Sequence, residues 1–254
     1  MTLRLKSALL ASGAHFLLSI LVALCMAWLV FYIWYPWPFD EVVRGRELFW
    51  LVIGVDVVCG PLLTLVLWNP AKLRKELALD LGLIVSIQVA ALVYGLHTVA
   101  LARPVHLVFE VDRLRLVTAV EIASGDLPQA PSHLRSLPWT GPTLLGTRAS
   151  RNSNETLNSI ELSIAGQEPS VRPGWWQDYA LSKKEILGRA KPMSILFDMR
   201  SQQRPLIEKA IRESGKLEAD LAWLPFTSAH TTEWVVLLDK QTAIPLSYAH
   251  VDGF

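Results

Sequence analysis

The amino-acid sequence predicts a membrane protein in which three transmembrane α-helices precede an α+β soluble domain with a small antiparallel sheet. Charge is the first observation, because residues 1–102 hold 7 Lys and Arg and 6 Asp and Glu, whereas residues 103–254 hold 17 of each. The second observation is that the charge-poor part contains three long apolar runs. The remainder is long enough for one domain with its own core. We therefore divide the chain into a transmembrane region, 1–102, and an α+β domain, 103–254.

The first apolar run is longer than a membrane helix needs. From Ser7 to Phe39 the sequence contains no Asp, Glu, Lys or Arg, whereas about 20 apolar residues are enough to span a bilayer. The run ends in the aromatic stretch FYIWYPWPFD and not in the small-residue cleavage site of a signal peptide. It therefore predicts a retained anchor over about 9–34.

Two further runs predict spans over about 48–68 and 78–101. Tryptophans lie near the ends of the spans, where amphipathic rings prefer the membrane–water boundary. They are Trp28, Trp34, Trp37, Trp50 and Trp68.

Basic residues near the span ends predict the orientation. Lys and Arg concentrate in cytoplasmic loops. Five of them precede the first span or lie between the second and third, against three on the other side: Arg4, Lys6, Lys72, Arg74 and Lys75 against Arg44, Arg46 and Arg103. The N-terminus is therefore expected in the cytoplasm and residues 103–254 on the other side of the membrane, which in a Gram-negative bacterium is the periplasm.

The outer domain begins and ends with a predicted β-hairpin. β-rich runs at about 105–111 and 114–121 flank Asp112-Arg113, which predicts a tight turn, and runs at about 233–239 and 244–249 repeat the plan. Residues 123–147 are rich in Pro, Gly and Ser and predict a long loop. We expect the first and last strands to join in one small antiparallel sheet.

Helical signals lie between the two hairpins. Ser182 with Glu185 fits a capping box. Pro205 at a first turn and Gly215 as a stop predict a second helix. A third segment, NSNETLNSIELSIAG, places three apolar side chains on one helical face: Leu157, Ile160 and Ile164.

Composition and motifs exclude several classes of function. A formal net charge of +1 lacks the basic excess of a nucleic-acid-binding protein. The two cysteines, Cys25 and Cys59, form no CxxC pair, and the histidines of the outer domain show no metal-ligand spacing. Nucleophile-elbow, Walker and dinucleotide-binding motifs do not occur. We therefore expect no metal, no cofactor and no enzymatic activity.

Trp175 and Trp176, in GWWQDY, are the most conspicuous aromatic pair of the outer domain. They either cap the local core or form a partner-binding platform. The sequence leaves both interpretations open.

Polar residues inside the second span form the most informative group. An uncompensated carboxylate costs roughly 2.5–3.5 kcal/mol at the centre of a membrane helix, yet Asp56 lies there. Asp56, Gly60 and Thr64 recur every four residues and so share one helix face. Small residues at this spacing let another helix approach closely.

The third span offers hydrogen-bonding partners for Asp56, namely Gln88, Tyr94 and His97. Three interpretations remain open. Asp56 is a buried structural acid that holds the three helices together, or its face docks another protein's membrane helix, or it acts with Asp80 in an intramembrane hydrolase.

Several stretches in order resemble the type IV pilin accessory proteins of the TfpX/TfpZ family. They are FYIWYPWPF, GVDVVCGPLLTLVLWNPAK, ELALDLGLIVSIQVAALVYGLHTV and ARPVHLVFEVDR. The resemblance implies an inner-membrane protein that assists the production, stability or assembly of one cognate type IV major pilin. The pilin, membrane lipid and other pilus assembly proteins are then the expected partners. The rival interpretations are the hydrolase and a periplasmic ligand sensor.

Overall fold

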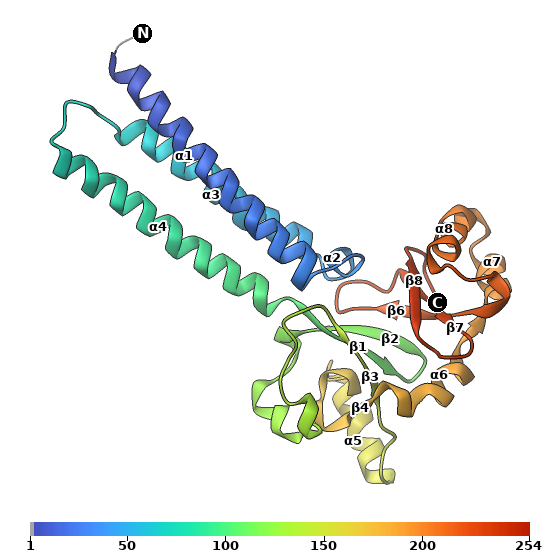
Figure 1. Cartoon of the computed structure of the whole chain (residues 1–254). Coiled ribbons are helices and arrows are strands. Elements are labelled where there is room, and N and C mark those ends of the chain that lie inside the picture. The colour runs from blue at the N-terminus through green and yellow to red at the C-terminus, as the bar shows by residue number, and fades with distance from the viewer. Residues whose placement is uncertain (1–2) are drawn as a thin grey trace. The chain divides into compact units, whose positions relative to one another are not determined.

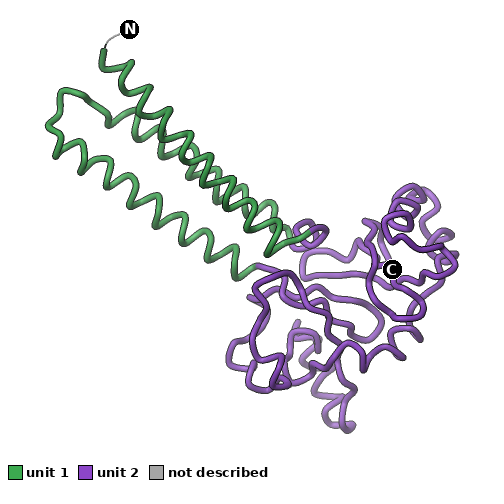
Figure 2. Tube along the Cα trace, viewed as in Figure 1, with its two compact units in different colours: residues 1–36, 44–102 green, residues 37–43, 103–254 purple. Residues whose placement is uncertain are grey.

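The computed structural model describes residues 3–254 and divides into two compact units (Figure 2). Unit 1 comprises Met1–Pro36 and Arg44–Ala102, and unit 2 comprises Trp37–Val43 and Arg103–Phe254. The change between residues 102 and 103 coincides with the change in composition along the chain. The short segment 37–43, which the sequence places in a loop between two spans, belongs to unit 2.

Unit 1 consists of three long helices (Figure 1): α1 (Leu3–Trp28), which continues into a π-helical stretch (Leu29–Trp34), α3 (Gly45–Leu67) and α4 (Arg74–Leu101). Each is long and apolar enough to cross a membrane. The shortest, α3, has 23 residues and is therefore about 35 Å long, more than the roughly 30 Å hydrocarbon layer. The three long apolar helices that the sequence predicts are confirmed as candidate membrane spans.

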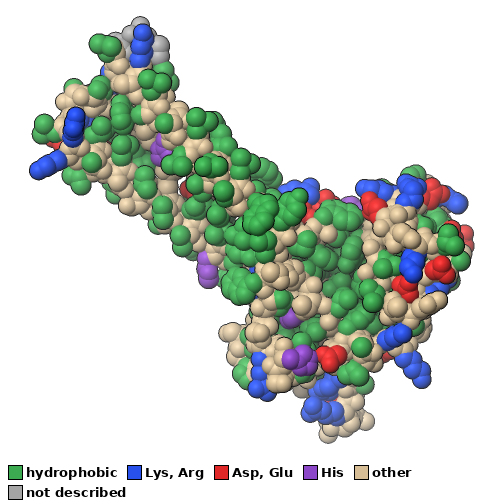
Figure 3. Space-filling model, in the orientation of Figure 1, with side chains coloured by type: hydrophobic (Ala, Val, Ile, Leu, Met, Phe, Trp, Pro, Cys, Tyr) green, Lys and Arg blue, Asp and Glu red, His purple; other side chains and the backbone are tan. Residues whose placement is uncertain are grey.

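Most side chains of these helices face outward. Figure 3 shows apolar side chains over the visible face of unit 1, with Lys and Arg gathered at the end where α1 begins and α3 joins α4. Only 6–22% of each apolar window is buried inside the protein. An outward-facing apolar surface of this kind is suited to lipid.

The central helix of unit 1 is α3, because it packs against both α1 and α4, whereas α1 and α4 make few contacts with each other. Glycines allow the close approach of α3 and α4: Gly95 lies against the side chain of Val52. Just after the π-helical stretch that continues α1, the Tyr35 hydroxyl donates to the carbonyl of Val99 at 2.6 Å. The three helices are thereby tied together at one end and diverge along the α1–α4 side.

Unit 2 is built on one mixed sheet of eight strands, in the order β4-β3-β1-β2-β6-β7-β8 with β5 paired to β6. The strands are β1 (Pro104–Glu110), β2 (Arg113–Thr118), β3 (Thr143–Thr147), β4 (Trp176–Asp178), β5 (Lys191–Pro192), β6 (Leu221–Thr227), β7 (Trp234–Asp239) and β8 (Pro245–Ala249). The α+β fold class is confirmed.

The sheet is mixed where the sequence led us to expect antiparallel pairing throughout. Strand β1 pairs with β3, and β2 with β6, in parallel. Parallel neighbours need long crossover connections, and both pairs have them: the segment rich in Pro and Gly leads to β3, and several helices precede β6. The β1–β2 hairpin therefore occupies the middle of the sheet and joins its two halves.

Two apolar cores lie against the sheet. In one, α7 (Met193–Met199) and α8 (Arg204–Ser214) cover β6 and β7 through residues such as Leu196, Ile207 and Trp223. In the other, the segment that follows β2 covers β1 and β3 around Val108 and Leu145.

The segment 37–43 is anchored to this sheet. It contains the short helix α2 (Phe39–Val42), and the Phe39 ring packs edge-on against Phe226 and Tyr248. The Ser228 hydroxyl donates to the carbonyl of Val42 at 2.7 Å. These contacts explain why the segment belongs to unit 2 although it follows the first span directly.

Some local predictions for unit 2 are confirmed and others are not. Pro205 in the first turn of α8 and Gly215 at its left-handed end are confirmed. The first hairpin turns at Val111-Asp112, one residue earlier than predicted. The expected long loop 123–147 contains β3.

The predicted capping box at Ser182 is wrong. Ser182 stands before α6 (Lys183–Arg189), but its side chain makes no capping bond. Its hydroxyl instead accepts a hydrogen bond from the Gln177 side chain at 2.9 Å. The Ser182 hydroxyl therefore makes a tertiary contact in place of the helix-capping bond that the local pattern predicts.

The apolar face of α5 (Ser153–Ile164) turns to solvent. Leu157, Ile160 and Ile164 are all exposed, and the buried residue of this helix is Ser159, whose hydroxyl accepts from Arg172 at 2.6 Å. The helix therefore packs through its polar face.

Candidate functional site

The predicted polar face of α3 lies at the junction of the three helices of unit 1. Asp56 is the middle residue of α3, and Gly60 and Thr64 follow it along the same face. Gly60 and Thr64 are buried, whereas Asp56 is partly exposed. This face forms the floor of the candidate site.

Helix α1 contacts one end of this face through polar side chains. The Thr64 hydroxyl and Nδ1 of His15 are 2.6 Å apart, and the Ser12 hydroxyl donates to the carbonyl of Pro61 at 2.8 Å. Both bonds join neighbouring apolar helices, so they hold α1 and α3 in one register. Thr64 is therefore a structural member of the set.

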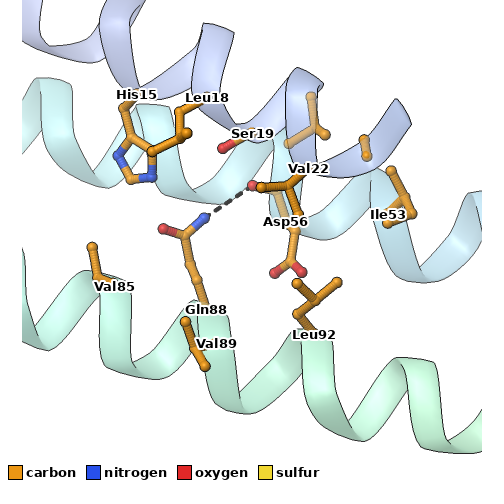
Figure 4. A pocket seen from close by; sticks show the side chains of 12 residues that line it. His15, Leu18, Ser19, Val22, Ile53, Asp56, Val85, Gln88, Val89 and Leu92 are labelled. Atoms are coloured by element: carbon orange, nitrogen blue, oxygen red, sulfur yellow. Dashed lines mark hydrogen bonds between the residues drawn. The ribbon is translucent and has the colours of Figure 1, made fainter. Parts of the chain in front are cut away.

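Helix α4 contacts the face through Gln88. Its side-chain amide donates to the backbone carbonyl of Asp56 at 3.1 Å (Figure 4). The same amide occupies the space where a side chain on Gly60 would be. Gly60 thus makes room for Gln88, which binds the backbone of Asp56 and not its carboxylate.

The Asp56 carboxylate faces a cavity of about 130 Å³ between the three helices. Helix α1 lines it with residues from His15 to Ala23, α3 with Ile53, Asp56 and Val57, and α4 with residues from Val85 to Leu92. Figure 4 shows the carboxylate pointing across the cavity toward Leu92. Among residues 3–254 it has no hydrogen-bond donor. An acceptor without a donor among residues 3–254 thus lies at the middle of α3.

Tyr94 and His97 lie elsewhere on α4. At 100° per residue, they are rotated from Gln88 by about 240° and about 180° around the helix. Both are exposed, Tyr94 at 75%. The structure therefore does not bring these two predicted partners to Asp56, and the helical rotation explains why.

Asp80 is also remote from Asp56. It forms an ion pair with Lys72 at 2.5 Å, and it lies eight residues before Gln88, or about 12 Å along the axis of α4. A catalytic pair of aspartates would need the two carboxylates side by side. This arrangement disfavours the hydrolase interpretation.

Trp176 and Trp175 have different environments. Trp176 is 2% exposed, its indole N–H donates to the carbonyl of Ser170 at 2.8 Å, and it packs edge-on against His106. The Trp175 ring contacts the guanidinium groups of Arg148 and Arg172, which lie 4.5 and 4.7 Å from its centre. Trp176 is thus a core residue, and Trp175 belongs to a cation–π stack.

Unit 2 also contains buried charged side chains that no sequence pattern predicted. Arg115 pairs with Glu121 at 2.8 Å and with Glu168. Glu110, on the neighbouring strand, accepts a hydrogen bond from the backbone N–H of Ser170 at 3.0 Å, and burial raises its pKa.

His106 is buried in the same part of the sheet. Its Nδ1 lies 2.8 Å from the Thr143 hydroxyl. Burial lowers its pKa to about 4, so the ring is neutral at neutral pH. No cluster of three or more metal-ligating side chains occurs among residues 3–254.

Comparison with known proteins identifies relatives that match nearly the whole chain and others that match part of it. It is 37% identical over 244 residues to the fimbrial assembly protein of Dichelobacter nodosus serogroup E1, covering 96% of this chain and 95% of the relative. The protein of serogroup I matches with the same identity and coverage. That of serogroups C1 and C2 is 48% identical over 119 residues, covering 47% of this chain and 91% of the relative.

The family description "Fimbrial assembly protein FimB" matches residues 3–44, which include α1. No solved structure matches the chain. Because the two full-length matches cover nearly all of both sequences, this chain belongs to the fimbrial assembly protein family.

Proposed function

We propose that this protein is an inner-membrane accessory protein of the TfpX/TfpZ type that assists the production, stability or assembly of one specific type IV major pilin. Membership of the fimbrial assembly family supports a role in pilus assembly. The excess of basic residues before α1 and between α3 and α4 supports a cytoplasmic N-terminus and a periplasmic unit 2.

The pilin's membrane helix docks in the cavity between α1, α3 and α4. The observation that carries this proposal is the open Asp56 carboxylate. Lipid chains offer it no hydrogen bond, and an unsatisfied polar group in hydrocarbon costs several kcal/mol. A protein helix can supply the missing donor, and the few contacts between α1 and α4 leave a side by which it can enter.

The pilin head meets unit 2 in this proposal. Trp176 is buried, so Trp175 alone of that aromatic pair remains available for a partner. We therefore assign the main contact to the membrane helix and a secondary one to the head.

The test is recovery of pilin with the purified full-length protein. Asp56→Asn keeps a hydrogen-bond acceptor and should recover pilin nearly as well as the wild type. Asp56→Leu removes the acceptor and fills the cavity, so pilin recovery should fall roughly tenfold, as expected for about 1.4 kcal/mol. Surface pili should fall in parallel.

Gly54→Leu is the matched control. It adds the same side chain two residues away on α3, at a position where a Cβ meets nothing within 4 Å, and it should leave pilin recovery unchanged. Normal recovery with Asp56→Leu would disprove docking at this site. A fall in the level of the Asp56→Leu protein itself would favour the purely structural interpretation.

A further inference from the structure

The α1–α3 pair borders two hollows of different chemistry. The cavity that contains Asp56 also has the polar side chains of His15, Ser19 and Gln88 in its lining. The second hollow has a volume of about 260 Å³ and lies between residues 20–27 of α1 and residues 49–58 of α3. It is lined by apolar side chains and Gly54. An apolar hollow of this kind is filled adequately by lipid chains or apolar side chains.

The Asp56 cavity requires a more specific occupant. Gln88 is already committed to the Asp56 backbone, and His15 to Thr64. The Ser19 hydroxyl, the third polar group of the lining, makes no hydrogen bond to the carboxylate among residues 3–254. The remaining need is therefore a donor for the carboxylate, supplied from outside these residues. A cavity of about 130 Å³ has room for a short side chain, whereas the long stem of Lys or Arg favours reaching the membrane surface.

We infer that the occupant of this cavity is a membrane helix of another chain that presents one short hydroxyl side chain, Ser or Thr, at the depth of Asp56. This inference rests on the proposed function and names the chemistry by which the partner helix is recognised. The hydroxyl donates to the Asp56 carboxylate while the apolar remainder of the helix packs against α1 and α4. Interhelical hydrogen bonds of this kind add modestly to association in membranes.

The experiment uses the full-length protein in lipid nanodiscs and two synthetic Leu/Ala helices of about 21 residues. The helices are identical except for Ser or Ala at the central position, and binding is measured by energy transfer between dyes. The Ser helix should bind about tenfold more tightly than the Ala helix, which corresponds to about 1.4 kcal/mol.

The preference should persist in Asp56→Asn, whose amide oxygen still accepts, and disappear in Asp56→Leu. Gly54→Leu, which fills the apolar hollow, should leave the preference unchanged. Circular dichroism of each variant checks that the three helices are intact. The comparison of Ser and Ala helices on the wild-type protein needs no variant, so it stands even if Asp56→Leu does not fold.

Equal binding of the two helices by the wild type, or binding of neither, would overturn the inference. A preference that survives Asp56→Leu would overturn it as well, because the donor would then be meeting another group. Pilin recovery is measured separately. If pilin co-purifies without any preference for Ser, only this inference fails, and if Ser is preferred while pilin is not recovered, the proposed function fails.

Discussion

In unit 2 the buried guanidinium of Arg115 meets the carboxylates of Glu121 and Glu168, whereas in unit 1 the carboxylate of Asp56 meets no donor among residues 3–254. Glu121 also accepts hydrogen bonds from the backbone and side chain of Thr118, both at 2.8 Å. The charge of Arg115 is therefore paired within the chain, which is typical of groups that stabilise a fold. An ionisable side chain without a partner in a membrane helix is typical of a functional site.

The largest effect is expected when the paired charge of unit 2 is removed. Arg115→Met should destabilise unit 2 by about 3 kcal/mol, because it leaves two carboxylates without their cation in a largely buried place. Hydrogen exchange of the β1 and β2 peptides in the full-length protein measures the change. Arg204→Met, which removes an exposed pair with Glu208, should change exchange by at most about 0.5 kcal/mol. Equal effects of the two variants would contradict this account of the network.

A smaller effect concerns pH. The pKa of His106 falls from 6.5 to about 4 on folding, so the unfolded chain binds more protons between these values and unit 2 loses stability as the pH falls from 6.5 toward 4. From pH 7 to pH 5 the loss is about 2 kcal/mol. Urea unfolding followed by near-ultraviolet circular dichroism, which detects Trp176 beside His106, measures it.

The control for this prediction is His106→Asn, which has no titrating ring and should lose less stability over the same pH range. Glu110 acts in the opposite sense, because its raised pKa makes stability fall as the pH rises through it. The quantity to compare is therefore the difference between wild type and variant. An identical loss in both proteins would show that another group is responsible.

The smallest expected effect concerns two glycines of unit 1, one at a tightly packed position and one at an open position. A Cβ on Gly95 would collide with the β-branched side chain of Val52, whereas one on Gly54 meets nothing within 4 Å. Gly95→Ala should lower the stability of the helical unit by about 1 kcal/mol through overpacking. Gly54→Ala should be neutral or slightly stabilising. Thermal unfolding of the detergent-solubilised protein measures both, and a more harmful Gly54→Ala would contradict the observed packing.

The sequence alone determined the features that depend on local pattern. Hydropathy and length predicted the three spans, because any helix that crosses a bilayer must hide its backbone and present apolar side chains. Pro205 and Gly215 predicted the limits of α8, because each restricts or permits the backbone angles needed there. The four-residue spacing likewise placed Asp56, Gly60 and Thr64 on one face.

The tertiary structure alone decided how these pieces meet. Strand β6 escaped prediction because Pro225 within it argues against an inner strand. Pro225 is tolerated because it falls between the pairing of β6 with β5, at Ala222 and Trp223, and its pairing with β2, at Phe226 and Thr227. Similarly, the burial of Ser159 instead of Ile160 on α5 depends on Arg172, which is distant in sequence.

The candidate site shows the same division. The sequence identified Asp56 as costly and Gln88, Tyr94 and His97 as polar groups on the next span. Which of them reaches α3 depends on the rotation and register of α4, and that is set by packing along the whole helix, including Gly95 on Val52. Gln88 therefore binds the Asp56 backbone while Tyr94 and His97 turn outward. A carboxylate left without a donor among residues 3–254 is a property of three packed helices, which no single stretch of sequence encodes.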